Sequence, residues 1–229
     1  MATTASSSSS SSPSPATPAP KPASPSALTP ATRRRGLITI LVDTFLVWGG
    51  FYMVVPLISV HYVDQLGWAA AGIGVVLAIR QLLQQGLTPI SGIIADRFGP
   101  KGLICAGVLL RSVGFVAMAW ATTFPLLMLS AVLTALGGSL FESPKSAAIA
   151  ALTDDAQRNR FYSLTGIASA LGITIGTQIG ALILNVDFSL VALLGAACFL
   201  LDFFITLIFL PSVRVATHDE SLTYGIGLA

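Results

Sequence analysis

Six long apolar segments leave this sequence few folds to adopt. Each is about 20 residues or longer, the length that an α-helix needs to cross the hydrocarbon core of a bilayer. Only 10% of the residues are charged, whereas soluble domains carry about 25%. The sequence therefore predicts an all-α membrane protein with six transmembrane helices. We expect these helices at Leu37–Ser59, Ala70–Ala95, Leu103–Thr122, Leu126–Leu152, Leu164–Leu184 and Phe188–Leu210.

The two ends of the chain differ from this apolar part. The first 32 residues hold 10 serines, 7 of the 13 prolines and no acidic residue. Such a composition cannot bury enough apolar surface to fold, so residues 1–35 are predicted to be a disordered Ser/Pro/Ala-rich cytoplasmic tail. This tail lacks the apolar segment of a secretory signal and the amphipathic arginine pattern of a transit peptide. Residues 36–211 are then a six-helix bundle, and residues 212–229 are the start of a cytoplasmic central loop or tail.

Basic residues lie before the first span, after the last one and in every second connection between them. The other connections, HYVDQLGW, ATTFP and NVDFS, contain no lysine or arginine. Since cytoplasmic loops are enriched in basic residues, both termini are predicted to be cytoplasmic, in a plasma membrane of the bacterial inner-membrane type. The basic residues concerned are Arg33, Arg34, Arg35, Arg97, Lys101, Arg158, Arg160 and Arg214.

Six ionisable residues fall inside the predicted spans. Each costs roughly 2.5 to 3.5 kcal/mol at the centre of an isolated membrane helix, so such residues are normally paired, hydrated or functional. Three acids and three bases predict ion pairs within the bundle. The six residues are Asp43, Arg80, Arg111, Glu142, Lys145 and Asp202.

Two interpretations of these charges remain open. In the functional one, Asp43 and Glu142 accept protons beside Arg80 or Arg111. Arg80 and Gln84 share a helix face, four residues apart, that should line a wet cavity or pack on another span. In the structural one, permanently ionised pairs fix helix packing, which we favour for Arg111 and Asp202.

The connection between the second and third spans carries a compact motif, GIIADRFGPKG. Its glycines permit a tight turn, and its basic residues suit the anionic cytoplasmic surface. The segment resembles motif A of the major facilitator superfamily. That resemblance implies a gate latch in which Asp96 holds the two halves of a transporter together. The usual basic residue four positions after the acid is Pro100 here. The matching positions are Gly92, Asp96, Arg97, Gly99 and Lys101.

The fifth span carries a glycine repeat at Gly172, Gly176 and Gly180. The repeat is similar to motif C of the superfamily's antiporters, although Thr177 replaces the proline and Ala181 the last glycine. A packing face of small residues explains the same spacing equally well.

Further segments, including DTFLVWGGFYMVVPLISVHYVDQLGWAAAGIGV and LGGSLFESPKSA, are similar to the N-terminal half of MdtH-type multidrug-resistance drug/proton antiporters. By that likeness the central cavity would be bordered by charged or amide side chains and by aromatic rings of the first span. The residues are Asp43, Arg80, Gln84 and Glu142, with Phe45, Trp48, Phe51 and Tyr52.

The resemblance implies proton-coupled export of lipophilic drugs or similar small molecules, by a truncated half or by a half that dimerises. The expected partners are a small-molecule substrate, protons, membrane lipids, and a C-terminal half or second copy, with no nucleic acid. Alternatives are an uptake symporter for a small metabolite and a non-transporting fragment. An intramembrane protease needs a buried serine and histidine, which His61 and His218 cannot supply, so we expect no enzyme. No cofactor or metal site is indicated.

Overall fold

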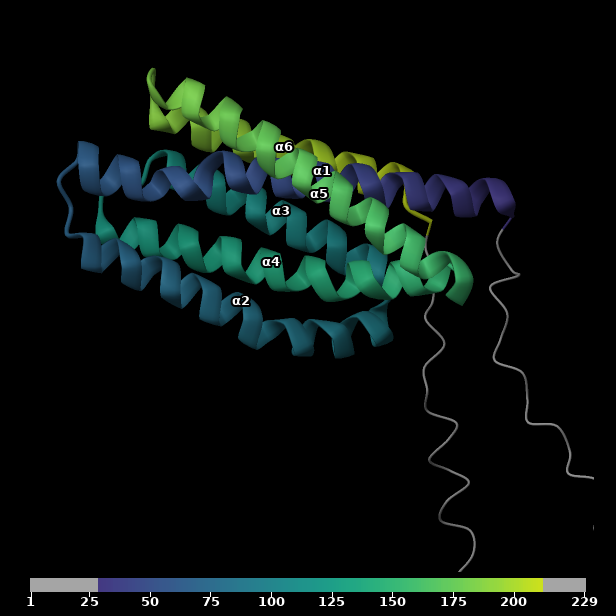
Figure 1. Cartoon of the computed structure of the whole chain (residues 1–229). Helices are drawn as coiled ribbons and strands as arrows, with labels where there is room; N and C mark the ends of the chain where they lie inside the picture. Colours follow the sequence, from purple (N-terminus) through teal and green to yellow (C-terminus); the bar gives the residue numbers. More distant parts are fainter. Residues whose placement is uncertain (1–28, 212–229) are drawn as a thin grey trace, which may run out of the picture.

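The computed structural model describes residues 29–211, apart from the side chains of residues 96–98 and 155, as six long helices joined by short turns (Figure 1). All six are long and apolar enough to cross a membrane, which confirms the predicted all-α fold with six transmembrane helices. A π-helical turn, η1 (Val60–Gln65), prolongs the first helix. The helices are α1 (Pro30–Ser59), α2 (Ala70–Phe98), α3 (Pro100–Ala119), α4 (Phe124–Leu152), α5 (Asp155–Leu184) and α6 (Phe188–Phe209).

Four helices begin earlier than predicted, and the difference is largest for α1 and α5. Helix α1 starts at Pro30, so residues 30–35 are helical and do not belong to a disordered tail. Thr29 caps this start by accepting a hydrogen bond from the Thr32 backbone N–H, and proline suits the first helical position. Helix α5 starts at Asp155, before its apolar run begins. Residues 1–28 and 212–229 lie outside the described residues, so the predictions for those segments stay predictions.

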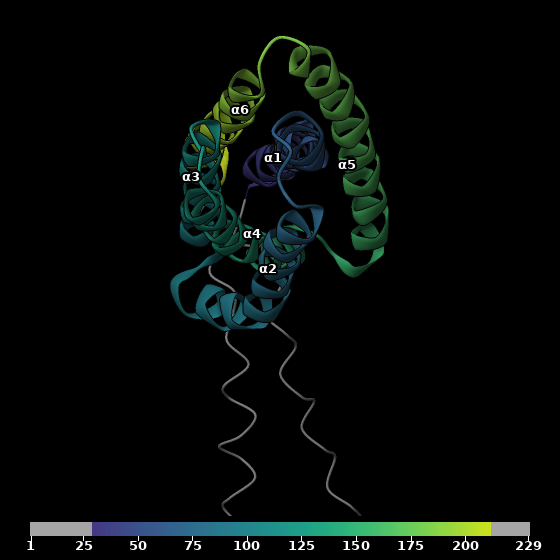
Figure 2. The same cartoon turned by 90° about the vertical axis from the view of Figure 1, so that its left-hand side faces the viewer.

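Helix α1 occupies the middle of the bundle, as the view in Figure 2 shows. It packs against α5 on one side and α6 on the other, while α3 packs against both α4 and α6, and α2 against α4. Helices α2 and α5 expose apolar side chains such as Leu82 and Leu182, which are 73% and 71% exposed. The part of α1 that carries Trp48 and Phe51 lines a cavity together with residues of α2.

The helices are held together by aromatic packing and by hydrogen bonds from small side chains. Phe115 of α3 stacks on Phe199 of α6, with ring centroids 5.3 Å apart. Ser112 Oγ donates to the Ala196 carbonyl (2.9 Å), and Tyr62 Oη donates to the Ala121 carbonyl (2.9 Å). Contacts of this kind replace the hydrophobic driving force, which is weak between helices that lie in lipid.

The glycine repeat of α5 faces α1 at backbone distance. A Cβ atom added to Gly172, Gly176 or Gly180 would crowd or overlap a carbonyl oxygen of α1. The repeat is therefore a packing face, as small residues at four-residue spacing predict. A role as an antiporter motif stays a prediction.

The motif at the α2–α3 turn is only partly described. Gly99 ends α2 with φ 85°, a conformation that favours glycine, and Gly92 packs close to Ser143 of α4. The side chains of Asp96 and Arg97 lie outside the described residues, so the gate-latch role stays a prediction. Asp154, between α4 and α5, forms an ion pair with Arg33 of α1 (2.8 Å).

Candidate functional site

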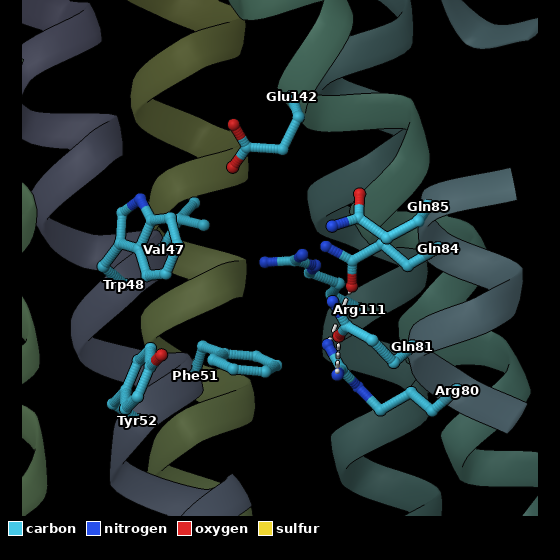
Figure 3. Close-up of a pocket in the computed structure, with 10 residues that line it drawn as sticks. All are labelled: Val47, Trp48, Phe51, Tyr52, Arg80, Gln81, Gln84, Gln85, Arg111 and Glu142. Atoms are coloured by element: carbon cyan, nitrogen blue, oxygen red, sulfur yellow. Dashed lines mark hydrogen bonds between the residues drawn. The ribbon is translucent and has the colours of Figure 1, made fainter. Parts of the chain in front are cut away.

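A cavity of about 370 Å³ lies among α1, α2, α3 and α4 within the membrane-spanning part of the bundle (Figure 3). Four of the five predicted proton or substrate residues line it, namely Arg80, Gln84, Arg111 and Glu142. The structure thus brings together residues that are up to 62 positions apart in the sequence. The complete lining is Val47, Trp48, Phe51, Tyr52, Arg80, Gln81, Gln84, Gln85, Arg111 and Glu142.

Helix α1 supplies an aromatic wall. Trp48 and Tyr52, one turn apart, are stacked with ring centroids 5.8 Å apart, and Phe51 meets Tyr52 edge-on at 5.3 Å. Phe45, predicted to belong to this wall, is not among the lining residues. The backbone of α1 at Phe45 lies against Gly172 of α5, so this turn of α1 is covered by α5. The wall offers flat apolar surface to a ligand.

Helix α2 supplies a facing wall of amides around one arginine. Arg80 Nη2 donates to Gln84 Oε1 (2.8 Å), and Nη1 donates to Gln81 Oε1 (3.4 Å). The guanidinium also lies 4.4 Å from the ring centroid of Phe51, a cation–π contact across the cavity. Neutral amides and an aromatic ring therefore surround this charge, and no carboxylate within the described residues pairs with it.

Arg111 enters the cavity from α3 and is 3% exposed. Its guanidinium lies between two aromatic rings, 5.5 Å from the centroid of Phe51 and 5.6 Å from that of Phe199. A Cβ atom added to Gly138 of α4 would overlap both Arg111 Nη2 and Gln84 Oε1. The absent side chain at Gly138 is what lets these two groups approach α4. The Gly137–Gly138 doublet is the sequence signal for this close approach.

Glu142 is the one acidic residue of the lining, and it is already paired. Lys145 Nζ lies 3.0 Å from Glu142 Oε2, one turn along α4, and also 5.0 Å from the ring centroid of Phe141. Among the six ionisable residues of the spans, all of which are described, this is the only ion pair. The prediction that the others pair is wrong, because aromatic rings and amides surround the two arginines.

Asp43 does not border the cavity, contrary to the prediction. It lies one helical turn before Val47, where α6 covers α1, and is 1% exposed beside Asp202 and Thr206. Arg111 and Asp202, for which the sequence favours structural ion pairs, likewise form no ion pair among the described residues. Sequence reasoning missed the approach of Asp43 to Asp202; the one sequence signal for it is that Asp202 is the only acid within the sixth apolar run.

Comparison with known proteins assigns this arrangement to a family. The sequence profile of the Major Facilitator Superfamily matches residues 40–223. A multidrug resistance protein MdtH from Edwardsiella ictaluri is 46% identical over 200 residues, and one from Photorhabdus laumondii is 44% identical over 200 residues. Each alignment covers 87% of this chain and 50% of the relative. The chain therefore spans about half the length of the curated relatives it matches.

Solved structures agree on the fold. A crystal structure of the peptide transporter POT in complex with sulfate superposes with a TM-score of 0.63 at 24% sequence identity. The superposition covers 76% of this chain and 37% of that chain. At this level of identity the likeness shows a shared fold and says nothing of a shared substrate.

Proposed function

This chain belongs to the major facilitator superfamily of membrane transporters, and from that premise we propose that it is the N-terminal half of a proton-coupled exporter of lipophilic drugs or similar small molecules. It is a multi-pass membrane protein. We place it in the bacterial inner membrane with both termini in the cytoplasm, because the basic residues lie in alternate connections. Its partners would be an amphiphilic substrate, protons and the surrounding lipids.

The observation that carries this proposal is the lining of the cavity. An aromatic wall on α1 faces amides and two guanidinium groups from α2 and α3. Binding sites for small molecules combine apolar surface with a few convergent polar groups, and transporters of this type bind substrate near the membrane midplane. The cavity provides both features on one side, and the second half would supply the opposite wall.

The charges of the lining favour one kind of amphiphile. Arg80 and Arg111 face the cavity and form no ion pair with a carboxylate in the part of the chain that the structure describes, whereas the charge of Glu142 is balanced by Lys145. The wall therefore carries net positive charge. A flat aromatic molecule with a carboxylate or another acceptor group would complement both the rings and the guanidinium groups. Lipophilic cations, which the aromatic rings alone would accept, would be repelled.

We expect the purified chain to bind pyrene-1-carboxylate at least about tenfold more tightly than 1-pyrenylmethylammonium, a difference of about 1.4 kcal/mol. Fluorescence anisotropy in detergent measures both affinities. Substituting Arg111→Gln should remove most of the preference, because it removes a buried cation from the cavity. Arg160→Gln, at an exposed position of α5, is the matched control and should leave the preference unchanged. Equal affinities for the two probes would overturn this substrate class.

A second experiment asks what completes the carrier. We expect cells that express the chain alone to export little of a pyrene probe, and export to appear when the C-terminal half of the Edwardsiella ictaluri MdtH relative is co-expressed. Half of a two-half carrier forms only one wall of the site. Export by the chain alone, together with a dimer in crosslinking, would instead favour two copies of this chain.

An uptake symporter for a small metabolite is the alternative. The net positive charge of the wall favours it because an anionic metabolite would complement the two guanidinium groups. The direction in which the probe moves relative to the proton gradient distinguishes the two functions. In right-side-out vesicles with an acidic exterior, an exporter that exchanges substrate for protons expels the probe, whereas a symporter accumulates it.

A further inference from the structure

Two aspartates meet between α1 and α6, outside the cavity. Asp43 is 1% exposed and Asp202 is 0% exposed, and Thr206 lies one turn beyond Asp202 on α6. Both carboxyl groups lie well inside the membrane-spanning helices. A buried carboxylate in such a place requires a counter-charge, hydrogen-bond donors or a proton.

The surroundings provide too few donors. Within residues 29–211, Asp43 Oδ1, both carboxyl oxygens of Asp202 and Thr206 Oγ1 have no hydrogen-bond partner. The neighbouring threonines of α1 are not available, because Thr39 and Thr44 donate to helix carbonyls. Among the described residues beside the pair, the Thr206 hydroxyl is one donor available to Asp43, and a proton on one carboxyl group would supply a second.

The charged groups facing the pair do not neutralise two negative charges. Lys145 of α4 acts on Asp43 from a distance but forms its ion pair with Glu142, and Arg111 of α3 acts on Asp202 but lies against aromatic rings. The other titratable groups that interact with the pair are the thiols of Cys105 on α3 and Cys198 on α6, and Lys101, in the first turn of α3, acts on Cys105. Two ionised carboxylates side by side would repel each other strongly.

We propose that Asp43 and Asp202 form a proton-binding site between α1 and α6, in which the two carboxyl groups share one proton. A proton fits better than a metal ion. The site lies between regular helices whose backbone carbonyls are engaged in helical hydrogen bonds, so only side-chain oxygens face it, and hard cations take about six oxygen ligands.

The proton-binding site is linked to the cavity through one face of α1. Asp43, Val47 and Phe51 follow one another at four-residue spacing on α1, and Phe51 contacts both arginine side chains of the cavity. Loss of the shared proton would leave two carboxylates that repel each other. This repulsion would push α6 away from α1 and displace the face of α1 that carries Asp43, Val47 and Phe51. As a coupling site the pair rests on the proposed transport function; as a proton-binding site it does not.

Infrared spectroscopy of the purified full chain in detergent tests the site directly. The unmutated chain should show a carbonyl stretch from a protonated, buried carboxyl group that disappears at alkaline pH. Asp43→Asn and Asp202→Asn should each remove this band, whereas Asp64→Asn, at an exposed position of η1, should retain it. A band that persists in both buried variants, or its absence from the unmutated chain, would overturn the site. Suppression of the band by sodium at constant ionic strength would indicate a cation site instead.

Stability against pH gives a second measure of the same site. The folded chain should lose thermal stability as pH rises, because deprotonation leaves two buried charges in contact, and this slope should vanish in either buried variant. Both variants resemble a protonated aspartate in shape, so folding should survive. For the coupling role, Asp202→Asn should abolish export driven by a pH gradient in the co-expression system. If even the unmutated chain exports nothing there, the proposed function fails while the infrared result still decides the proton site.

Discussion

Substituting Gly176→Ala is expected to destabilise the folded chain, while the same substitution at Gly166 of the same helix should stabilise it. Glycine costs up to about 1 kcal/mol relative to alanine inside a helix, so alanine gains stability wherever its methyl group fits. Around Gly166 no atom lies within reach of an added Cβ, whereas at Gly176 the Cβ would overlap the Gly49 carbonyl oxygen of α1. Forcing the two backbones apart should cost about 1 to 3 kcal/mol, which exceeds the gain.

Thermal unfolding of the two variants in the same detergent measures the change in unfolding temperature, which should be negative for Gly176→Ala and positive for Gly166→Ala. A further variant, Gly180→Ala, should behave like Gly176→Ala, because its Cβ would overlap the Met53 carbonyl oxygen. If Gly176→Ala and Gly166→Ala shifted the unfolding temperature in the same direction, helix α5 would not pack on α1 through its glycine face. That outcome would also reopen the antiporter-motif interpretation of the repeat.

The sequence predicts the fold well because its main signals are local. Apolar length fixes the six spans, and four-residue spacing places Arg80 and Gln84 on one face, where a hydrogen bond of 2.8 Å joins them. The packing interpretation of the glycine repeat is equally local, since glycines four apart must lie on one side of a helix. Glu142 and Lys145 also meet through spacing within a single helix, at 3.0 Å.

Partners on different helices are harder to predict, because depth in the membrane does not fix which neighbour a helix face meets. Counting charges predicts ion pairs, yet Arg111 lies between the rings of Phe51 and Phe199. Asp43 shares a face of α1 with the cavity residue Phe51, but α6 covers the turn of that face that carries Asp43. These positions depend on how α3 and α6 rotate about their axes, which composition and periodicity leave open.

Two faces of α1 give this helix a central position in the bundle. One contacts the glycines of α5 at backbone distance. The other carries Phe51 of the aromatic wall and, two turns earlier, places Asp43 against α6. A displacement of α1 would therefore change the packing, the binding wall and the buried acid together. Helices α2 and α5 flank it, and each buries only 17% of its most apolar 18-residue window inside the bundle.

Substituting Glu142→Gln is expected to abolish export driven by a pH gradient in the co-expression system, while exchange of probe between the two sides without a gradient continues. Glu142 is the only acid of the cavity lining among the described residues, so in the proposed exporter it is the cavity residue expected to take part in proton coupling. Measuring export and exchange in the same vesicles separates the two activities. A merely structural role would lower both equally.

The pairing with Lys145 requires a control, because the glutamine variant leaves a half-buried lysine without its counter-charge. That unpaired charge could disturb α4 by itself. The double variant Glu142→Gln with Lys145→Met removes both charges and should restore the stability of the bundle without restoring export driven by pH. If the double variant regains that export, Glu142 acts only as the partner of Lys145, and the Asp43 and Asp202 pair is left as the site of the coupling proton.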